Sequence, residues 1–170
     1  VFVAVGSPSL MDGGTDMSQV REVAHLLAEV LDQYTVIAIK STVPAGTIQM
    51  VQQILAEHGA EGVHADVVAN LEFLREGVGL RDFFFPARIV VGTDSDQARQ
   101  TMRRLYADFI DDAPPSDPPV QMARGVPYLE TTAVTAQMIK YAANAFLATR
   151  VSFINEVAGI CEQVGADIAD

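Results

Sequence analysis

Short apolar runs and helix-like repeats alternate along the first 110 residues. The runs at positions 1–5, 35–39, 66–69 and 88–92 are rich in Val, Ile and Ala and predict buried β-strands. Apolar residues recur every three or four positions across 18–31, 47–55 and 95–109, which predicts helices. Strands that alternate with helices indicate an α/β protein built on a largely parallel, doubly wound sheet.

A different pattern begins near position 132. Apolar residues recur three or four apart as far as position 165, with one gap of seven and no Pro. A helix of that length extends on the order of 50 Å, which is longer than an ordinary crossover helix. We therefore predict two domains: residues 1–130, which hold the sheet, and residues 131–170, a long helix that begins a central helical domain. The Pro-rich stretch 113–119 between them is predicted to be a surface connection.

Composition and charge exclude several classes of protein. The chain has 11 Lys and Arg against 22 Asp and Glu, a net charge of -11, which argues against nucleic acid as a partner. Because no apolar run reaches about 18 residues, no membrane span is expected. Cys161 is the single cysteine, so an internal disulfide is impossible and a reducing, cytoplasmic location is expected. The three histidines are scattered, and no metal site is predicted.

Polar residues cluster where three of the predicted strands end. Residues 6–9 follow the first strand, residues 40–46 follow the second, and residues 70–77 follow the third. In open parallel sheets, ligands bind beyond the carboxyl ends of the strands. The three clusters are therefore predicted to share one site.

Two of these clusters carry candidate chemical groups. Glu72 and Glu76 are four residues apart, so they point the same way if the segment is helical. Burial and mutual repulsion would then divide acid and base roles between them, whereas the alternative is a solvated helix face. The hydroxyls of Ser41 and Thr42 suit a ribose or a reacting hydroxyl, although Ser and Thr before Pro are commonly turn or cap residues.

The long helix carries one polar pair on its apolar pattern. Lys140 and Asn144 lie one turn apart, and a partly buried Lys can stabilise a developing oxyanion. The alternative is a surface Lys whose ammonium reaches solvent. Cys161 falls at core spacing between Val157 and Val164, so a buried structural thiol is predicted there in preference to a nucleophile.

Taken together, these segments resemble the UDP-glucose/GDP-mannose dehydrogenase family, in the same order and at fitting distances. The stretches that carry the resemblance include VGSPS at 5–9, KSTVPAGT at 40–47, NLEFLREG at 70–77, RIVVG at 88–92 and KYAANAFLAT at 140–149. The resemblance covers nearly the whole chain. It implies that the sheet is the second half of a Rossmann-like, NAD-binding domain. It also implies that the long helix packs between subunits of a homodimer or larger homo-oligomer.

The activity that the resemblance implies is a four-electron oxidation of a nucleotide sugar. The C6 alcohol of UDP-glucose becomes the aldehyde and then the carboxylate of UDP-glucuronate, with reduction of two NAD. On this basis Thr42 orders a water and the C6 oxygen, Glu72 assists hydrolysis of a covalent thioester, and Glu76 contacts cofactor or catalytic water. Lys140 stabilises the oxyanion and Asn144 helps to place the sugar.

Two sets of binding residues follow from the same resemblance. The cofactor-binding residues are Val5, Gly6, Ser7, Pro8, Ser9, Ser41, Thr42, Val43 and Glu76. The substrate-binding residues are Glu72, Phe73, Leu74, Arg75, Glu76, Lys140 and Asn144. Among these, the backbone of Phe73 and Leu74 is similar to the part of the family that grips the substrate.

Departures from the family pattern set limits on these expectations. Leu71 stands where the family usually has Pro, so the loop that carries the two carboxylates is expected to be less rigid. The sequence has no Gly-x-Gly-x-x-Gly phosphate loop, and it starts directly on a predicted strand. Cys161 does not match the family's nucleophilic Cys, which is expected beyond Asp170. We therefore expect an internal piece of a longer enzyme that is inactive by itself.

Three other interpretations stay open. A GDP-mannose or UDP-N-acetylmannosamine dehydrogenase would differ in the sugar, and the residues around Glu76 resemble the UDP-glucose branch more. A non-catalytic dimerisation or binding module would keep the long helix but would not need Thr42, Glu72 and Lys140 together. A 6-phosphogluconate or hydroxyisobutyrate type dehydrogenase shares the Rossmann domain and the Lys–Asn pair. Its two-electron chemistry, however, has no use for a thioester-hydrolysing carboxylate.

Overall fold

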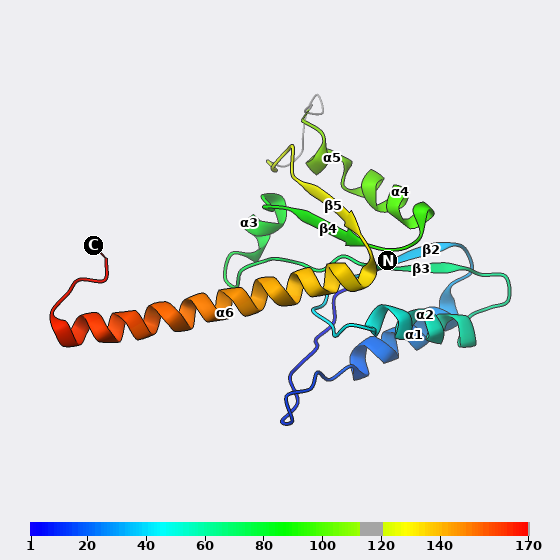
Figure 1. Cartoon of the computed structure of the whole chain (residues 1–170). Helices are drawn as coiled ribbons and strands as arrows, with labels where there is room; N and C mark the ends of the chain where they lie inside the picture. The colour runs from blue at the N-terminus through cyan, green and yellow to red at the C-terminus, as the bar shows by residue number, and fades with distance from the viewer. Residues whose placement is uncertain (113–120, 170) are drawn as a thin grey trace.

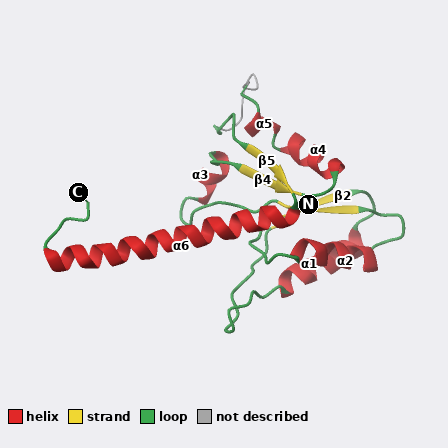
Figure 2. Ribbon diagram, in the orientation of Figure 1, coloured by secondary structure: helices red, strands yellow, loops and turns green. Residues whose placement is uncertain are grey.

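The structure, a computed structural model, describes residues 1–112 and 121–169 (Figure 1). The strands form one five-stranded sheet in the order β1-β2-β3-β4-β5. They are β1 (Phe2–Val3), β2 (Thr35–Ile39), β3 (Ala65–Ala69), β4 (Ile89–Gly92) and β5 (Tyr128–Thr131). The helices are α1 (Ser18–Val30), α2 (Thr47–His58), α3 (Gly79–Phe84), α4 (Asp96–Leu105), α5 (Ala107–Ile110) and α6 (Ala133–Val164) (Figure 2). The predicted Pro-rich connection at 113–119 lies outside the described residues.

Successive residues of the central strands enter two hydrophobic cores, one on each face of the sheet. Ile37 and Ile39 pack in the core that α1, α2 and the start of α6 complete. Ala38, between them, faces the core that α4 and α5 cover. Helices therefore lie on both faces (Figure 1), and the predicted doubly wound α/β fold is confirmed.

Two strands of the sheet, β4 and β5, run against the other three. The pairs β1–β2, β2–β3 and β4–β5 are parallel, whereas β3 and β4 pair antiparallel through Ala69 and Gly92. The sequence predicted a largely parallel sheet and gave no sign of this reversal. Because β4 is reversed, its first residues lie at the same edge as the carboxyl ends of β2 and β3. The segment that precedes β4, including Arg88, is thereby brought to the edge where the polar clusters meet.

Several predicted element bounds are wrong in detail. The strand predicted over residues 1–5 covers only Phe2–Val3, and the Val5 carbonyl accepts a hydrogen bond from the Ser41 hydroxyl instead. The helix predicted over 95–109 is two helices, because Tyr106 leaves helical geometry between α4 and α5. Neither α3 nor β5 was predicted from the sequence.

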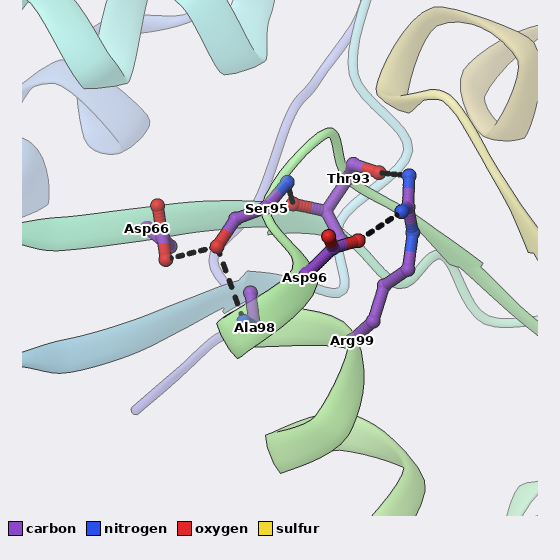
Figure 3. A network of polar contacts seen from close by, with 6 residues as sticks. All are labelled: Asp66, Thr93, Ser95, Asp96, Ala98 and Arg99. Carbon is purple, nitrogen blue, oxygen red and sulfur yellow. Dashed lines mark hydrogen bonds and ion pairs between the residues drawn. The ribbon is translucent and has the colours of Figure 1, made fainter.

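A polar network joins β3 to the start of α4 (Figure 3). The Ser95 hydroxyl donates to Asp66 and accepts the backbone N–H of Ala98, which caps α4. One turn into the helix, the Arg99 guanidinium lies 2.7 Å from the Asp96 carboxylate. Since β3 and β4 are antiparallel, this network lies at the opposite edge of the sheet from the three polar clusters. Its role is to fix the start of α4.

The long helix α6 begins inside the protein and continues beyond it. Thr132 caps its first turn by accepting the Thr135 N–H, and Gly165 ends it with a φ of 76°. Its buried residues all belong to the first turns: Ala133, Ala136, Gln137 and Lys140. The rest extends away from the sheet (Figure 1).

Apolar side chains on the outer part of α6 are exposed in the single chain. They include Phe146, Leu147, Val151, Phe153, Ile154, Ile160 and Val164. The prediction of a buried Cys161 is therefore wrong for this chain: Cys161 is only partly buried, and Val164 beside it is 71% exposed. The spacing was helical as expected, but the helix has left the core before it reaches Cys161.

Candidate functional site

A cavity of about 1060 Å³ opens between α6 and the edge of the sheet. Its wall comes from the ends of β2 and β3, the segment 82–90 and one side of α6. The predicted site residues in this wall are Glu72, Phe73, Leu74, Arg75, Glu76, Lys140 and Asn144. All the residues predicted to bind substrate thus line one cavity.

The ammonium of Lys140 is buried against the carboxylate of Glu72. Lys140 is 4% exposed, and its Nζ lies 3.3 Å from Glu72 Oε1. The other Glu72 oxygen accepts the backbone N–H of Leu74, which fixes the direction of the carboxylate. Nζ of Lys140 also lies 5.1 Å from the centre of the Phe73 ring. The interpretation of Lys140 as a surface lysine is therefore wrong.

The loop that carries Glu72 is anchored by its first two residues. The buried Asn70 amide donates to the Val90 carbonyl at 2.9 Å and accepts the Tyr106 hydroxyl at 2.6 Å. Burial raises the pKa of Tyr106 to about 12, so this hydroxyl remains a donor at neutral pH. Leu71 is 4% exposed and packs in the core below β3. A buried apolar side chain thus anchors the loop at the position where the family resemblance led us to expect Pro.

The far end of the same loop is tied to α3. The Arg75 guanidinium lies 2.7 Å from the Asp82 carboxylate, and the Arg75 backbone N–H also donates to it at 2.9 Å. These hydrogen bonds from Arg75 hold the pKa of Asp82 at about 2, below its ordinary value of 3.8. Arg75 therefore lines the cavity with its guanidinium already engaged in holding the loop.

The two glutamates do not share a helix face. Residues 70–77 form a loop in the structure, so the helical alignment considered for Glu72 and Glu76 is wrong. Glu72 is partly buried against Lys140, whereas Glu76 is exposed at the cavity wall. The two carboxylates consequently have different surroundings, which is the condition for different chemical roles.

The residues predicted to bind cofactor, apart from Glu76, lie at the ends of β1 and β2. The Ser7 hydroxyl donates to the Thr42 carbonyl at 2.9 Å, and the Ser41 hydroxyl donates to the Val5 carbonyl at 2.6 Å. These bonds join the two loops. Val43 is completely buried in the hydrophobic core, so the structure does not expose it to a ligand. The exposed members of the set are Gly6, Pro8 and Ser9.

One buried side chain connects the cofactor loop to α6. Gln137 is fully buried, and its Nε2 donates to the Pro44 carbonyl at 2.8 Å. Gln137 lies one turn before Lys140 on the helix. The loop that carries Thr42 and the cavity wall that holds Lys140 are therefore fixed to the same stretch of α6.

Two basic side chains of the cavity lining, those of Lys40 and Arg88, were not among the predicted site residues. Lys40 directly follows β2 and lines the cavity. Burial lowers the pKa of its ammonium, the Glu72 carboxylate opposes this shift, and the Lys140 ammonium adds to it. The Arg88 guanidinium lies 4.3 Å from the centre of the Phe73 ring. In the sequence, Lys40 belongs to the polar cluster at 40–46, and Lys40 and Arg88 both lie in stretches that carry the family resemblance. The position of Arg88 beside the cavity depends on the antiparallel β4, which the sequence did not reveal.

Metal and membrane sites were also considered. Within residues 1–112 and 121–169, no three His, Cys, Asp or Glu side chains are grouped so that they could ligate a metal ion. No helix in this described part of the chain combines the length and the apolar character that crossing a bilayer requires.

Known proteins match the chain over both of its parts. Residues 1–110 match the NAD binding domain of the UDP-glucose/GDP-mannose dehydrogenase family, and residues 134–170 match its central domain. UDP-glucose 6-dehydrogenase YwqF of Bacillus subtilis is 41% identical over 168 residues, which is 99% of this chain and 35% of that protein. The chain thus spans about 35% of the length of this curated relative.

Solved structures give the same result. A UDP-glucose dehydrogenase from Pyrobaculum islandicum superposes with a TM-score of 0.82 at 35% identity, over 98% of this chain and 36% of that chain. A GDP-mannose dehydrogenase from Pseudomonas aeruginosa superposes with a TM-score of 0.83 at 27% identity, over 99% of this chain and 36% of that chain. The match to an NAD binding domain supports NAD as the cofactor. With its fold, its cavity and both domain matches in agreement, the chain belongs to the UDP-glucose/GDP-mannose dehydrogenase family.

Proposed function

We propose that this chain is the part of an NAD-dependent UDP-glucose 6-dehydrogenase that surrounds the reacting sugar carbon. The observation that carries the proposal is the buried Lys140–Glu72 pair in the wall of a cavity that the other predicted substrate residues also line. A dehydrogenase of two-electron type would have no use for Glu72 there. The UDP-glucose 6-dehydrogenases among the relatives favour UDP-glucose over GDP-mannose or UDP-N-acetylmannosamine.

On the substrate side, Lys140 and Asn144 act from one face of α6. The Lys140 ammonium is positioned to donate to the C6 oxygen as negative charge develops on it, and burial strengthens that interaction. Asn144, one turn further along, presents an amide that can donate to and accept from sugar hydroxyls. Leu74 already donates its N–H to Glu72, so its carbonyl is the backbone group that remains for the substrate.

For the cofactor, the joined loops after β1 and β2 offer a fitting set of groups. NAD, when bound, accepts a hydride from the sugar carbon in each of two oxidation steps. The hydroxyls of Ser7, Ser9 and Thr42 suit ribose hydroxyls and phosphate oxygens, and such sites lie beyond the carboxyl ends of parallel strands. Thr42 also orders a water and the C6 oxygen, and Glu76 contacts cofactor or water from the cavity wall.

Glu72 serves the hydrolytic step. One alcohol, one water and two NAD give one carboxylate, two NADH and three protons. The thioester joins the oxidised sugar carbon to a cysteine of the full-length enzyme other than Cys161. The water attacks its carbonyl carbon, the water oxygen becomes the second carboxylate oxygen, and the C–S bond breaks to release the cysteine thiol. The Glu72 carboxylate, held by Lys140 and the Leu74 N–H, takes a proton from the attacking water.

We further propose the domain and subunit arrangement. The boundary lies at 130/131, where the sheet domain ends and α6 begins the central domain. The exposed apolar side chains of α6 fit pairing with a second copy of the same helix, which gives a homodimer or a larger homo-oligomer. The single, partly buried cysteine fits a cytoplasmic enzyme.

The test uses the full-length protein that contains this chain. We expect UDP-glucose to give two NADH per sugar and UDP-glucuronate as product. Reduction of NAD with GDP-mannose or UDP-N-acetylmannosamine but not with UDP-glucose would overturn the choice of sugar. One NADH per substrate and a ketone product would instead identify a two-electron dehydrogenase, and no reduction with any nucleotide sugar would favour a non-catalytic module.

A further inference from the structure

We propose that Lys40 is a second cation of the cavity which, together with Lys140, holds the anionic group formed at the sugar carbon, and above all the carboxylate of the product. The proposal rests on the proposed function, since it concerns the same cavity and the same carbon. It gives a role to a residue of the second polar cluster that was not named among the predicted site residues. It also predicts that the cavity distinguishes product from substrate by charge.

The backbone places Lys40 at the edge of the sheet where the cavity lies. Lys40 directly follows β2, and its N–H donates to the Val3 carbonyl at 2.8 Å, which continues the pairing with β1 by one residue. Its side chain is partly buried and lines the cavity together with Glu72 and Lys140. Lys40 is thus held by regular strand pairing, on a more rigid support than the loop that carries Glu72.

The charges around the cavity are unbalanced in favour of cations. Its lining holds four basic side chains, Lys40, Arg75, Arg88 and Lys140, against three carboxylates, Glu72, Glu76 and Asp82. The excess is one positive charge, in a chain whose net charge is -11. A local excess opposite to the charge of the whole chain favours an anionic ligand in this cavity.

The excess of positive charge is largest around Glu72. Arg75 and Asp82 pair with each other, so they cancel, and Glu76 is exposed. Two ammonium groups, those of Lys40 and Lys140, are left to share the Glu72 carboxylate. Burial lowers the pKa of Lys40, which means that its charge is incompletely compensated by its surroundings. A ligand carboxylate would supply the missing negative charge.

Substrate and product differ in charge at one position. The sugar carbon of the substrate carries a neutral hydroxymethyl group, and that of the product carries a carboxylate, while the nucleotide diphosphate is common to both. A cation that acts on this position therefore contributes to binding of the uronate and hardly to binding of the glucose form. Lys40 can be tested through that difference.

The experiment measures dissociation constants of UDP-glucose and UDP-glucuronate by titration calorimetry on the full-length protein. We expect Lys40→Met to weaken UDP-glucuronate by roughly ten- to a hundredfold, the range for lost charged hydrogen bonds, and UDP-glucose by less than about threefold. Lys40→Arg should restore most of the affinity for the uronate. Arg104→Met, an exposed cation on α4 outside the cavity, should change neither constant.

Each result of this experiment either supports or overturns the assignment of Lys40. Equal weakening of both ligands, or unchanged uronate binding, overturns the assignment of Lys40 while leaving the proposed function in place. A wild-type protein that binds neither ligand overturns the proposed function, and this inference falls with it. Lys40→Gln is measured in parallel, because its neutral polar side chain preserves folding if Met does not, and the same loss for the uronate alone is expected.

Discussion

The Lys140 ammonium nitrogen lies 3.3 Å from a carboxylate oxygen of Glu72, although 68 residues separate the two in sequence. The contact exists because the first turns of α6 pack against the edge of the sheet while the loop after β3 bends over them. A buried ammonium needs a partner of opposite charge, since leaving it unpaired is costly. The pair therefore stabilises the wall of the cavity, and it consists of the two groups to which the proposed function assigns the chemistry.

Replacing Lys140 tests the proposed oxyanion role. In the full-length enzyme, Lys140→Met should lower kcat by about 10² to 10³-fold, the usual cost of removing a preorganised donor to a developing oxyanion. NADH formation with UDP-glucose is the measurement. Arg104→Met is the control and should retain wild-type kcat. Retention of full activity in Lys140→Met would remove Lys140 from the chemistry.

Glu72→Gln should separate oxidation from hydrolysis. Without a base for the attacking water, hydrolysis should slow by about 10² to 10⁴-fold, while the oxidation steps before it proceed. We expect a rapid burst of NADH and a covalent sugar adduct that intact-protein mass spectrometry detects. Glu22→Gln, on the exposed side of α1, should show neither the burst nor the adduct. Slow NADH formation from the first turnover, without adduct, would place Glu72 elsewhere in the mechanism.

A single glycine sets how closely α6 approaches the sheet. A Cβ at Gly92 would lie 2.5 Å from the Cβ of Ala136 and 2.7 Å from the Thr132 carbonyl oxygen, so α6 would have to shift. We expect Gly92→Ala to lower the free energy of unfolding by about 1–3 kcal/mol, as overpacking does. A Cβ at Gly79 would meet only Leu74 Cδ1 at 4.0 Å. Gly79→Ala should therefore leave the urea midpoint of the full-length protein within experimental scatter, and an equal effect of both substitutions would contradict the packing argument.

Tyr106→Phe should destabilise the protein in a pH-dependent way. The substitution leaves the buried Asn70 oxygen without its donor, which costs about 1–3 kcal/mol. The pKa of Tyr106 is raised from 10.0 to about 12, so its protonated form contributes stability that is complete below pH 10 and is lost as pH rises toward 12. The difference in urea midpoint between wild type and variant should accordingly narrow between pH 10 and 12. A constant difference across that range would show that ionisation of Tyr106 is not linked to folding.

The proposed pairing of α6 predicts the effect of a charge on its outer part. Phe153 is 66% exposed in the single chain, and Phe153→Glu should place a carboxylate in the subunit interface and shift the full-length protein to monomers. Light scattering after size-exclusion chromatography gives the mass. Leu105→Glu, at a 54% exposed apolar position on α4, is the matched control and should keep the oligomer. An unchanged mass for Phe153→Glu would contradict the pairing.

The sequence predicted those strands and helices that show a clear pattern of apolar residues. β2 and β3 are runs of apolar residues, α1 and α2 show one apolar stripe each, and the bounds of α6 follow from Thr132 and Gly165 at its ends. It could not predict the direction of β4, because a short buried strand reads the same in a parallel and in an antiparallel pair. β5 was missed as well, since Glu130 and Thr131 make up half of its four residues and leave no apolar run.

The candidate site was predictable as a set of residues and not as a geometry. Glu72, Lys140 and Asn144 were singled out by their spacing and were given roles by the family resemblance, whereas the helical alignment considered for residues 70–77 was wrong. The side chains of Asn70 and Tyr106, far apart in sequence, decide the shape of that loop. Lys40 was missed because only tertiary packing shows that its ammonium is partly buried beside two other charged groups.

The outer part of α6 has a mechanical consequence for the cavity. The 24 residues that follow Lys140 make a rod about 36 Å long. A tilt of about 5° at the start of α6, near Gly92, moves its far end by about 3 Å. Conversely, if contacts hold the far end in place, the first turns of α6 keep their position to within a fraction of about 1 Å. In the proposed dimer, contacts at the far end of α6 would therefore help to hold Lys140 in place in the cavity wall.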